Sequence, residues 1–315
     1  MLIGDRLFVS SVDNELLKKE GMKRSTEIIS INGENPREYA NRELLPYISA
    51  STPQWADHMM FDGDRLTEGR KNSELTISLS SGNGAPVTEI IAKRDRKPAS
   101  KSYCYSFRTT TDNVGVLTLG DFASSEVTEL FASVYQEILK TESLLIDLRG
   151  NDGGNSNHAD YILRHLTTDS IACNNWTTPI YMPAYASWGR QPSVYVSSSG
   201  KVPPIEDKSP YLKPIVVVIY RGTFSAAEDF CALFRGMNRG LIAGTPSGGS
   251  TGNGVRVQLT KGIWANICSK HDRMADGTEF VGVGIIPDVT IELTPEEYFS
   301  DSEDAVIGKA KSLLR

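Results

Sequence analysis

An apolar run that ends in a tight turn at Ser225 limits the folds open to this chain more than any other feature. Residues 215–220 read Ile-Val-Val-Val-Ile-Tyr, and Gly222-Thr223-Phe224-Ser225 follows before a helical pattern that starts at Ala226. A short apolar run bounded by turn residues is typical of a fully buried strand. Many enzymes expose a nucleophile on a small hydroxyl residue between such a strand and a helix, so Ser225 is a candidate nucleophile.

A second strand and turn lie upstream. Residues 144–149 read Leu-Leu-Ile-Asp-Leu-Arg and run into Gly150-Asn151-Asp152-Gly153-Gly154, before a helix expected over residues 156–166. Glycines between a buried strand and a helix N-terminus let backbone N–H groups approach a substrate oxygen. We therefore expect the N–H groups of Ala226 and of Gly153 or Gly154 to form an oxyanion hole beside Ser225.

Plainer interpretations of these residues stay open. A serine followed three residues on by Glu228 is a capping box, so Ser225 by itself is explained as a helix N-cap. Gly153 and Gly154 are also ordinary turn residues. The turn lacks the flanking glycines of the α/β-hydrolase nucleophile elbow, so that fold is a weak match. Only the two motifs together favour a nucleophile beside an anion-binding turn.

The order of patterns predicts an α/β fold in two domains. Residues 113–119 read as a strand, 125–141 as a helix and 144–148 as a strand, which implies parallel pairing with right-handed crossovers. Residues 1–98 read instead as strands and short helices, and the polar stretch 97–102 is the expected linker to a domain over 99–315. Residues 176–211 read as a long excursion with a short hairpin, either a lid or substrate wall or a plain insertion.

The net charge and the spacing of the cysteines argue against nucleic acid and metal ions as partners. The chain of 315 residues has 33 basic against 39 acidic residues, a net charge of −6, which argues against nucleic acid as the main partner. The four cysteines show no metal-binding spacing, and we expect buried free thiols, with Cys231 in the core. No metal or organic cofactor is implied. No segment approaches the length of a membrane span.

The N-terminus begins almost inside a strand pattern. Met1-Leu2-Ile3-Gly4 shows no basic-then-apolar signal peptide, so we expect an upstream portion to be missing. The sequence gives no indication of the oligomeric state.

Four segments resemble the C-terminal processing (tail-specific) proteases and their tricorn-like relatives. They are the segment from Asp147 to Gly154, Thr223 to Glu228, Gly244 to Gly249, and the closing Gly282-Val283-Gly284-Ile285-Ile286-Pro287-Asp288. The resemblance implies a crotonase/ClpP-like spiral of ββα units over residues 99–315. Residues 25–34 resemble a PDZ phrase, which implies an N-terminally incomplete PDZ-like module over 1–98. By analogy, the protein is periplasmic or secreted in a bacterium.

The resemblance leaves the general base open. Processing proteases use a lysine, but Ser250 stands where that lysine would be. The tricorn-like branch uses a Ser-His-Ser-Glu tetrad, and here Ser250 and Glu279 match its second serine and its glutamate. Its histidine lies upstream of the PDZ-like module, where this chain has none. Among the four histidines, His271 is the best internal substitute, whereas His58, His158 and His165 have structural explanations.

The sequence therefore predicts a serine endopeptidase acting on peptides or unfolded proteins. Ser225 attacks the carbonyl, and an imidazole oriented by Ser250 or Glu279 carries the proton. A catalytically inactive peptide-binding homologue is the alternative. A crotonase-type acyl-CoA enzyme, which shares the oxyanion architecture, is a third interpretation.

Overall fold

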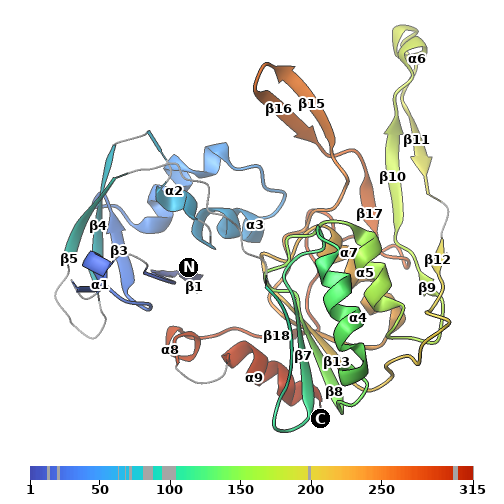
Figure 1. Cartoon of the computed structure of the whole chain (residues 1–315). Coiled ribbons are helices and arrows are strands. Elements are labelled where there is room, and N and C mark those ends of the chain that lie inside the picture. The colour runs from blue at the N-terminus through green and yellow to red at the C-terminus, as the bar shows by residue number, and fades with distance from the viewer. Residues whose placement is uncertain are drawn as a thin grey trace. The chain divides into compact units, whose positions relative to one another are not determined.

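The computed structural model divides the chain into two compact units (Figure 1). It describes residues 1–12, 15–19, 22–62, 64–67, 69–70, 73–80, 88–93, 104–197, 200–300 and 304–314. The first unit comprises Met1–Ser102 and Glu292–Gly308, and the second comprises Tyr103–Ile291 and Lys309–Arg315. The sequence had placed residues 292–308 in the second domain, and the expected linker, 97–102, lies outside the described residues.

A six-stranded sheet organises the second unit. Its order is β18-β14-β13-β8-β7-β6, and the strands from β7 to β18 pair in parallel, whereas β6 pairs antiparallel with β7. Every residue of β8 and β13 is buried, as a parallel strand covered on both faces requires. The bounds are β6 (Tyr105–Thr109), β7 (Val114–Leu119), β8 (Ser143–Asp147), β13 (Ile215–Ile219), β14 (Gly240–Gly244) and β18 (Val289–Thr290).

Three helices join successive parallel strands of this sheet, as Figure 1 shows: α4 (Glu126–Ile138), α5 (Ser156–Leu163) and α7 (Ala226–Met237). Their apolar sides meet the sheet in one core, which includes Phe131, Ile162 and Phe230 together with Ile146 and Val217. The predicted strand–helix alternation and parallel pairing are confirmed. The alternation also places the turns after β8 and β13 at the same edge of the sheet.

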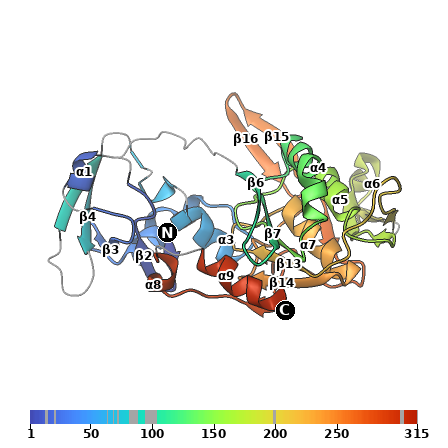
Figure 2. The same ribbon diagram turned by 60° about the horizontal axis from the view of Figure 1, so that its bottom comes forward.

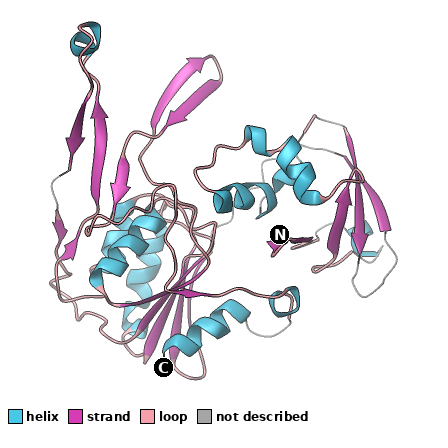
Figure 3. Cartoon of the chain, turned by 180° about the vertical axis from the view of Figure 1, so that it is seen from behind, coloured by secondary structure: helices cyan, strands magenta, loops and turns pink. Residues whose placement is uncertain are grey.

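Two hairpin arms project from the second unit (Figures 1 and 3). One consists of β10 (Asn175–Ile180), α6 (Pro183–Ser187) and β11 (Ser193–Val196), so the hairpin predicted within 176–211 is confirmed. The other consists of β15 (Val255–Thr260) and β16 (Ile263–Ile267). Strand β17 (His271–Arg273) pairs with β10, and the short strands β9 (Ile171–Ala172) and β12 (Lys201–Val202) pair with each other.

The first unit is built on an antiparallel sheet of order β1-β2-β3-β4-β5, part of which is visible in Figure 2. Its bounds are β1 (Leu2–Ile3), β2 (Arg6–Phe8), β3 (Glu27–Ile31), β4 (Glu74–Ser80) and β5 (Thr88–Lys93). Phe8 packs edge-on against Phe299, at 5.4 Å between ring centroids, which ties the returning segment to β2.

Short helices complete the chain. The α-helices are α1 (Glu15–Lys19), α2 (Pro36–Glu43), α3 (Pro53–Asp57), α8 (Pro295–Tyr298) and α9 (Ala305–Lys311). Single turns of other helix types are η1 (Leu45–Tyr47), η2 (His58–Asp62), η3 (Asp64–Thr67) and η4 (Ser312–Leu314). Over the described ranges, no helix is long and apolar enough to cross a membrane.

The four cysteines are free thiols. Cys231 is buried in the core, as predicted. The expectation of buried thiols is wrong for Cys104 and Cys268, which are exposed, and Cys173 is half-buried. Cys104 lies just before β6, and Cys268 lies between two short strands at the base of a hairpin arm, so neither position is covered by the core.

Candidate active site

The turn after β13 is fixed by the buried side chain of Thr223. Its hydroxyl donates to the carbonyl of Leu148, just after β8, at 2.9 Å and accepts from the N–H of Tyr220 at 3.0 Å. The carbonyl of Thr223 accepts from the N–H of Gly248 at 2.9 Å. One threonine therefore holds the ends of β8 and β13 and the segment after β14 together.

Ser225 has a strained backbone. Its φ is 55° and its ψ is −121°, a combination that costs a residue with a Cβ on the order of 1–3 kcal/mol. Its N–H donates to the carbonyl of Ser250 at 3.1 Å and to Oε2 of Glu228 at 3.1 Å, and its carbonyl accepts from the first turn of α7. These bonds hold Ser225 in a backbone conformation that belongs neither to a strand nor to a helix.

The glycine turn lies directly against this serine. A Cβ placed on Gly153 would lie 2.6 Å from Cβ of Ser225, 2.8 Å from the carbonyl oxygen of Phe224 and 3.0 Å from the nitrogen of Ala226. Gly153 also has φ 103°, where a side chain is strained. The two turns predicted to cooperate are thus in van der Waals contact, and only glycine fits between them.

Buried Asn151 sets the path of the glycine turn. Its side-chain N–H donates to the carbonyl of Leu119 at 3.0 Å, and its carbonyl accepts from the N–H of Phe224 at 3.0 Å. Its side-chain oxygen accepts from the N–H of Gly153 at 3.0 Å. The N–H of Gly153 therefore has an internal partner, whereas no described group accepts from the N–H of Gly154 or of Ala226.

Glu228 is the hub that joins Ser225 to the segment after β14. The carboxylate is fully buried and accepts from the hydroxyl of Ser247 at 2.5 Å and from the N–H groups of Gly249 at 2.7 Å, Ser250 at 2.9 Å and Ser225 at 3.1 Å. Burial raises the pKa of Glu228 to about 7, against the effect of these four bonds. The predicted capping role of Glu228 is thus one part of a larger network.

Glu279 lies in a separate pair with His271. The imidazole Nε2 hydrogen-bonds the carboxylate, and Nε of Arg273 donates to its other oxygen at 2.5 Å. The bonds from His271 and then from Arg273 lower the pKa of Glu279. His271 and Glu279 are 45% and 44% exposed, and in the part of the chain that is described neither side chain hydrogen-bonds Ser225.

Strand β17 nevertheless runs close to Ser250. Asp272, the buried neighbour of His271, accepts from the hydroxyl of Thr251 at 2.6 Å and from Nζ of Lys270 at 2.8 Å. Because side chains alternate along a strand, Asp272 points to the Thr251 side and His271 to the other. Ser250 itself meets Ser225 through its backbone carbonyl.

Comparison with known families matches this part of the chain to a peptidase family. Residues 113–291, which contain both turns and the His271–Glu279 pair, match the family described as Peptidase family S41. The chain belongs to this family. The predicted resemblance to C-terminal processing proteases is confirmed.

Curated relatives of this S41 chain include two processing proteases of Bacillus subtilis. The carboxy-terminal processing protease CtpA is 24% identical over 298 residues, which cover 92% of this chain and 54% of CtpA. The protease CtpB is 23% identical over 315 residues, which cover 94% of this chain and 54% of CtpB. This chain therefore spans about half the length of these relatives.

Solved structures share the fold of this S41 chain. Mature CPAF superposes with a TM-score of 0.69 at 15% identity, covering 99% of this chain and 80% of that one. The photosystem II D1 C-terminal processing protease gives a TM-score of 0.51 at 19% identity, covering 99% and 73%.

The other three histidines have structural partners. His158 Nδ1 bonds the carbonyl of Phe122 at 2.8 Å, and His58 Nδ1 bonds Asp62 at 3.1 Å. His165 is fully buried among the rings of Phe131, Tyr135 and Tyr161. Burial lowers the pKa of His165, because it disfavours the charged imidazolium.

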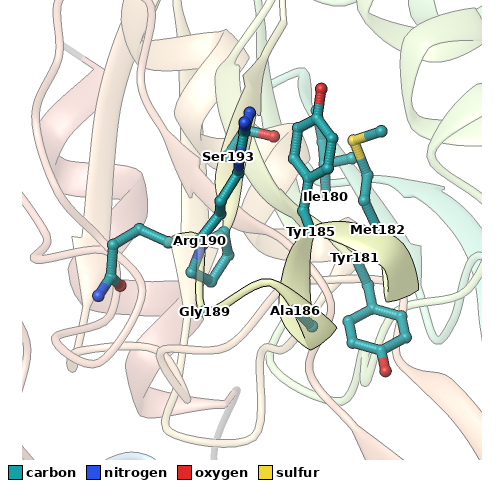
Figure 4. Close-up of a pocket in the computed structure, with 10 residues that line it drawn as sticks. Ile180, Tyr181, Met182, Tyr185, Ala186, Gly189, Arg190 and Ser193 are labelled. Atoms are coloured by element: carbon teal, nitrogen blue, oxygen red, sulfur yellow. The ribbon is translucent and has the colours of Figure 1, made fainter.

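A cavity of about 280 Å³ lies at the tip of the β10–β11 arm (Figure 4). Its lining includes Tyr181, Met182, Tyr185 and Arg190. It contains none of the predicted site residues. In the described ranges, no group of three or more acidic, histidine or cysteine side chains is arranged to hold a metal ion.

Sequence reasoning missed three residues that build the site. Asn151, Thr223 and Ser247 are all fully buried polar residues that bridge separate segments. Each of the three lies within one of the segments that resemble the processing proteases, so their importance could have been predicted. The prediction instead assigned chemical roles to the glycines and to Ser225 in the same segments.

Proposed function

We propose that this S41 chain carries the acylation site of a serine endopeptidase, with Ser225 as the nucleophile. The observation that supports this most is the contact of Gly153 with Cβ of Ser225 and the nitrogen of Ala226. A serine held at φ 55° between a buried strand and a helix N-terminus is the second support. A helix cap needs neither the strain nor the glycine contact.

In the proposed reaction, Ser225 Oγ attacks the carbonyl carbon of a peptide bond. The carbonyl oxygen gains the negative charge, and the N–H groups of Ala226 and Gly154 bind it. The base takes the hydroxyl proton and returns it to the leaving amine, and water then hydrolyses the acyl-enzyme. Gly153, whose N–H donates to Asn151, makes room for the substrate oxygen rather than binding it.

The proposed base is an imidazole from a segment upstream of this chain, oriented by Glu279. His271 bonds Glu279 but makes no hydrogen bond to Ser225 among the described residues. The carbonyl of Ser250 holds Ser225 in place. The carboxylate of Glu228 accepts from the backbone N–H groups of Ser225 and Ser250 and so fixes both residues.

A fluorophosphonate probe on the full-length gene product tests the proposal. The probe labels a serine only when the hydroxyl is activated, so we expect labelling that Ser225→Ala abolishes and Ser247→Ala, a variant of a buried structural serine, retains in part. Labelling that persists in Ser225→Ala would refute Ser225 as the nucleophile.

A second candidate function is a non-catalytic peptide-binding homologue. It is favoured by one observation: in the described part of the chain, no histidine ring hydrogen-bonds Ser225. Absence of labelling in the full-length product, together with retained peptide binding, would favour this homologue. Turnover of a CoA ester that survives Ser225→Ala would instead favour a crotonase-type enzyme.

We propose the remaining features by analogy. The first unit is a PDZ-like module, and the second unit, Tyr103–Ile291 with Lys309–Arg315, is a crotonase/ClpP-like spiral of the tricorn-like branch. The substrates are peptides or unfolded proteins in the bacterial envelope or outside the cell. Fractionation of cells that produce the full-length protein tests the compartment.

A further inference from the structure

The β15–β16 hairpin is a ribbon with one apolar face. Val255 pairs with Ile267 and Val257 with Ala265, so these four side chains share a face, and Ile263 joins them by alternation along β16. The opposite face carries Arg256, Gln258, Trp264 and Asn266. Period-2 alternation of this kind normally marks a sheet that packs one face on a core.

Among the residues that the structure describes, no core covers the apolar face of this ribbon. Val255, Ile263 and Ile267 are 53%, 56% and 56% exposed. Within the described residues, the sheet contains only β15 and β16, so the outer edge of each strand has unpaired backbone groups. An isolated two-stranded ribbon is marginally stable in water, and free edges of this kind accept a further extended strand.

The base of the ribbon is the candidate active site itself. Strand β15 follows the segment of Ser250 and Thr251, and β16 leads into β17, which holds His271. The hydroxyl of Ser269 closes the base by donating to the carbonyls of Asn253 at 2.8 Å and Gly252 at 3.2 Å. The ribbon therefore begins shortly after Ser250, whose carbonyl accepts from the N–H of Ser225.

The charge of the ribbon argues against a second copy of this chain as its partner. Between positions 254 and 267 the chain has Arg256 and Lys261 and no acidic residue. Two copies paired ribbon to ribbon would bring these cations together, whereas a neutral or acidic strand would not. The ribbon thus fits a partner that is extended, apolar at alternate positions and free of positive charge.

We propose that the β15–β16 ribbon docks an extended segment of the polypeptide substrate, with apolar residues at alternate positions, as an added strand. The backbone edges supply the hydrogen bonds, and the face of Val255, Ile263 and Ile267 takes every second side chain. The inference rests on the proposed function, because it assigns the docked chain as the substrate of the Ser225 site.

The test measures binding in Ser225→Ala protein, so it needs no catalysis. The probe is a fluorescein-labelled peptide in which valine alternates with serine, and the control peptide has the same composition with its valines in adjacent pairs. We expect the control peptide to bind at least about tenfold more weakly by fluorescence anisotropy, because only half its valines can face the ribbon.

Matched variants locate the binding. The triple variant Val255→Thr, Ile263→Thr, Ile267→Thr keeps β-propensity while removing the apolar face, and we expect it to lose about tenfold or more in affinity. The triple variant Arg256→Thr, Gln258→Thr, Asn266→Thr, on the opposite face, is expected to stay within about threefold. Far-UV circular dichroism checks that both remain folded.

Three outcomes would overturn the proposal. One is equal binding of the two peptides or equal affinity of the two triple variants. The second is self-association of the protein that the apolar-face variant abolishes while peptide binding is kept, which would make a second copy the partner. The third is binding to phosphatidylglycerol vesicles, lost in the same variant, without peptide binding.

The fluorophosphonate test of the proposed function is independent of this binding test. Absence of Ser225-dependent labelling with intact peptide binding would refute Ser225 as the nucleophile but not the docking of peptides on the ribbon.

Discussion

The turn at Ser225 and the His271–Glu279 pair differ in how far their polar side chains are exposed to solvent. Around Ser225, the side chains of Glu228 and Ser247 are fully buried and hydrogen-bonded. The His271–Glu279 pair is nearly half exposed, and exposed ion pairs contribute little to stability. The difference shows that the polar groups around the proposed nucleophile are buried and fixed by hydrogen bonds, whereas the pair proposed to orient the base is exposed to solvent.

The largest effect is expected from Gly153→Ala. The added methyl would overlap Cβ of Ser225 and the carbonyl of Phe224 at a backbone φ of 103°. Neither backbone segment can move without breaking the bonds of Asn151 and Thr223, so we expect hydrolysis to fall by about 10²- to 10³-fold, comparable to the loss of an oxyanion donor. Steady-state kinetics with a peptide substrate measure it.

Gly150→Ala is the matched control for this change. A Cβ on Gly150 meets nothing within 4 Å, although the residue lies in the same turn. We expect its activity to stay close to that of the wild type. Equal losses in the two variants would show that the close fit at Gly153 is irrelevant.

Glu228→Gln tests the buried half of the comparison through pH. The folded-state pKa of about 7 lies above the ordinary value of 4.5, so the group adds stability that is complete below about 4.5 and is lost as pH rises through 7. Glutamine removes this titration and places an amide donor against N–H donors, at a cost of about 1–3 kcal/mol. We expect a lower Tm and a flatter fall of Tm between pH 5 and 8.

Asp160→Asn gives the control for that slope. Burial, and then the charge of Asp229, raises the pKa of Asp160 to about 6, so it also contributes stability that is lost as pH rises. We expect its removal to flatten the Tm profile while hydrolysis is kept. A Glu228→Gln profile as steep as that of the wild type would show that Glu228 does not contribute to the fall of Tm with pH.

The exposed half is tested by comparing Glu279→Gln with His271→Gln. If Glu279 orients a base from outside this chain, its loss lowers kcat of the full-length protein by about 10- to 100-fold, whereas loss of His271 changes kcat by less than about threefold. Neither change is expected to alter Tm appreciably. A kcat that falls equally in both variants would make His271 the base and reverse the interpretation.

The smallest effect is expected from His165→Phe, which lies in neither region. His165 Nδ1 bonds the carbonyl of Tyr161 at 2.7 Å, and its buried Nε2 has no partner, so phenylalanine loses one bond and removes one unpaired group. We expect a change below about 1 kcal/mol at pH 8. Because burial lowers the pKa of His165, wild-type stability falls as pH drops below 6.5, and the variant is expected to be the more stable at pH 5.

The sequence was sufficient for the elements that local pattern determines. Uninterrupted apolar runs placed β8 and β13, and glycine spacing placed the two turns that meet at Gly153. Contact between Gly153 and Ser225 was predictable because parallel strands bring their carboxyl ends to one edge.

The rest of the site depends on contacts that no local pattern contains. Glu228 has the spacing of a capping box, and its bonds to Ser247, Gly249 and Ser250 arise only when the segment after β14 folds back. The apolar face of β15–β16 also escaped prediction, because alternation there indicates a buried face that the fold does not supply.

The chain passes between its two units three times, at the boundaries 102/103, 291/292 and 308/309. Removing the N-terminal residues alone would strip Tyr298 and Phe299 of Arg24 and Phe8, the side chains they stack on, and leave an apolar tail. Truncation at the N-terminus therefore cannot remove the first unit intact, and recombination can exchange it only by cutting the chain at all three boundaries.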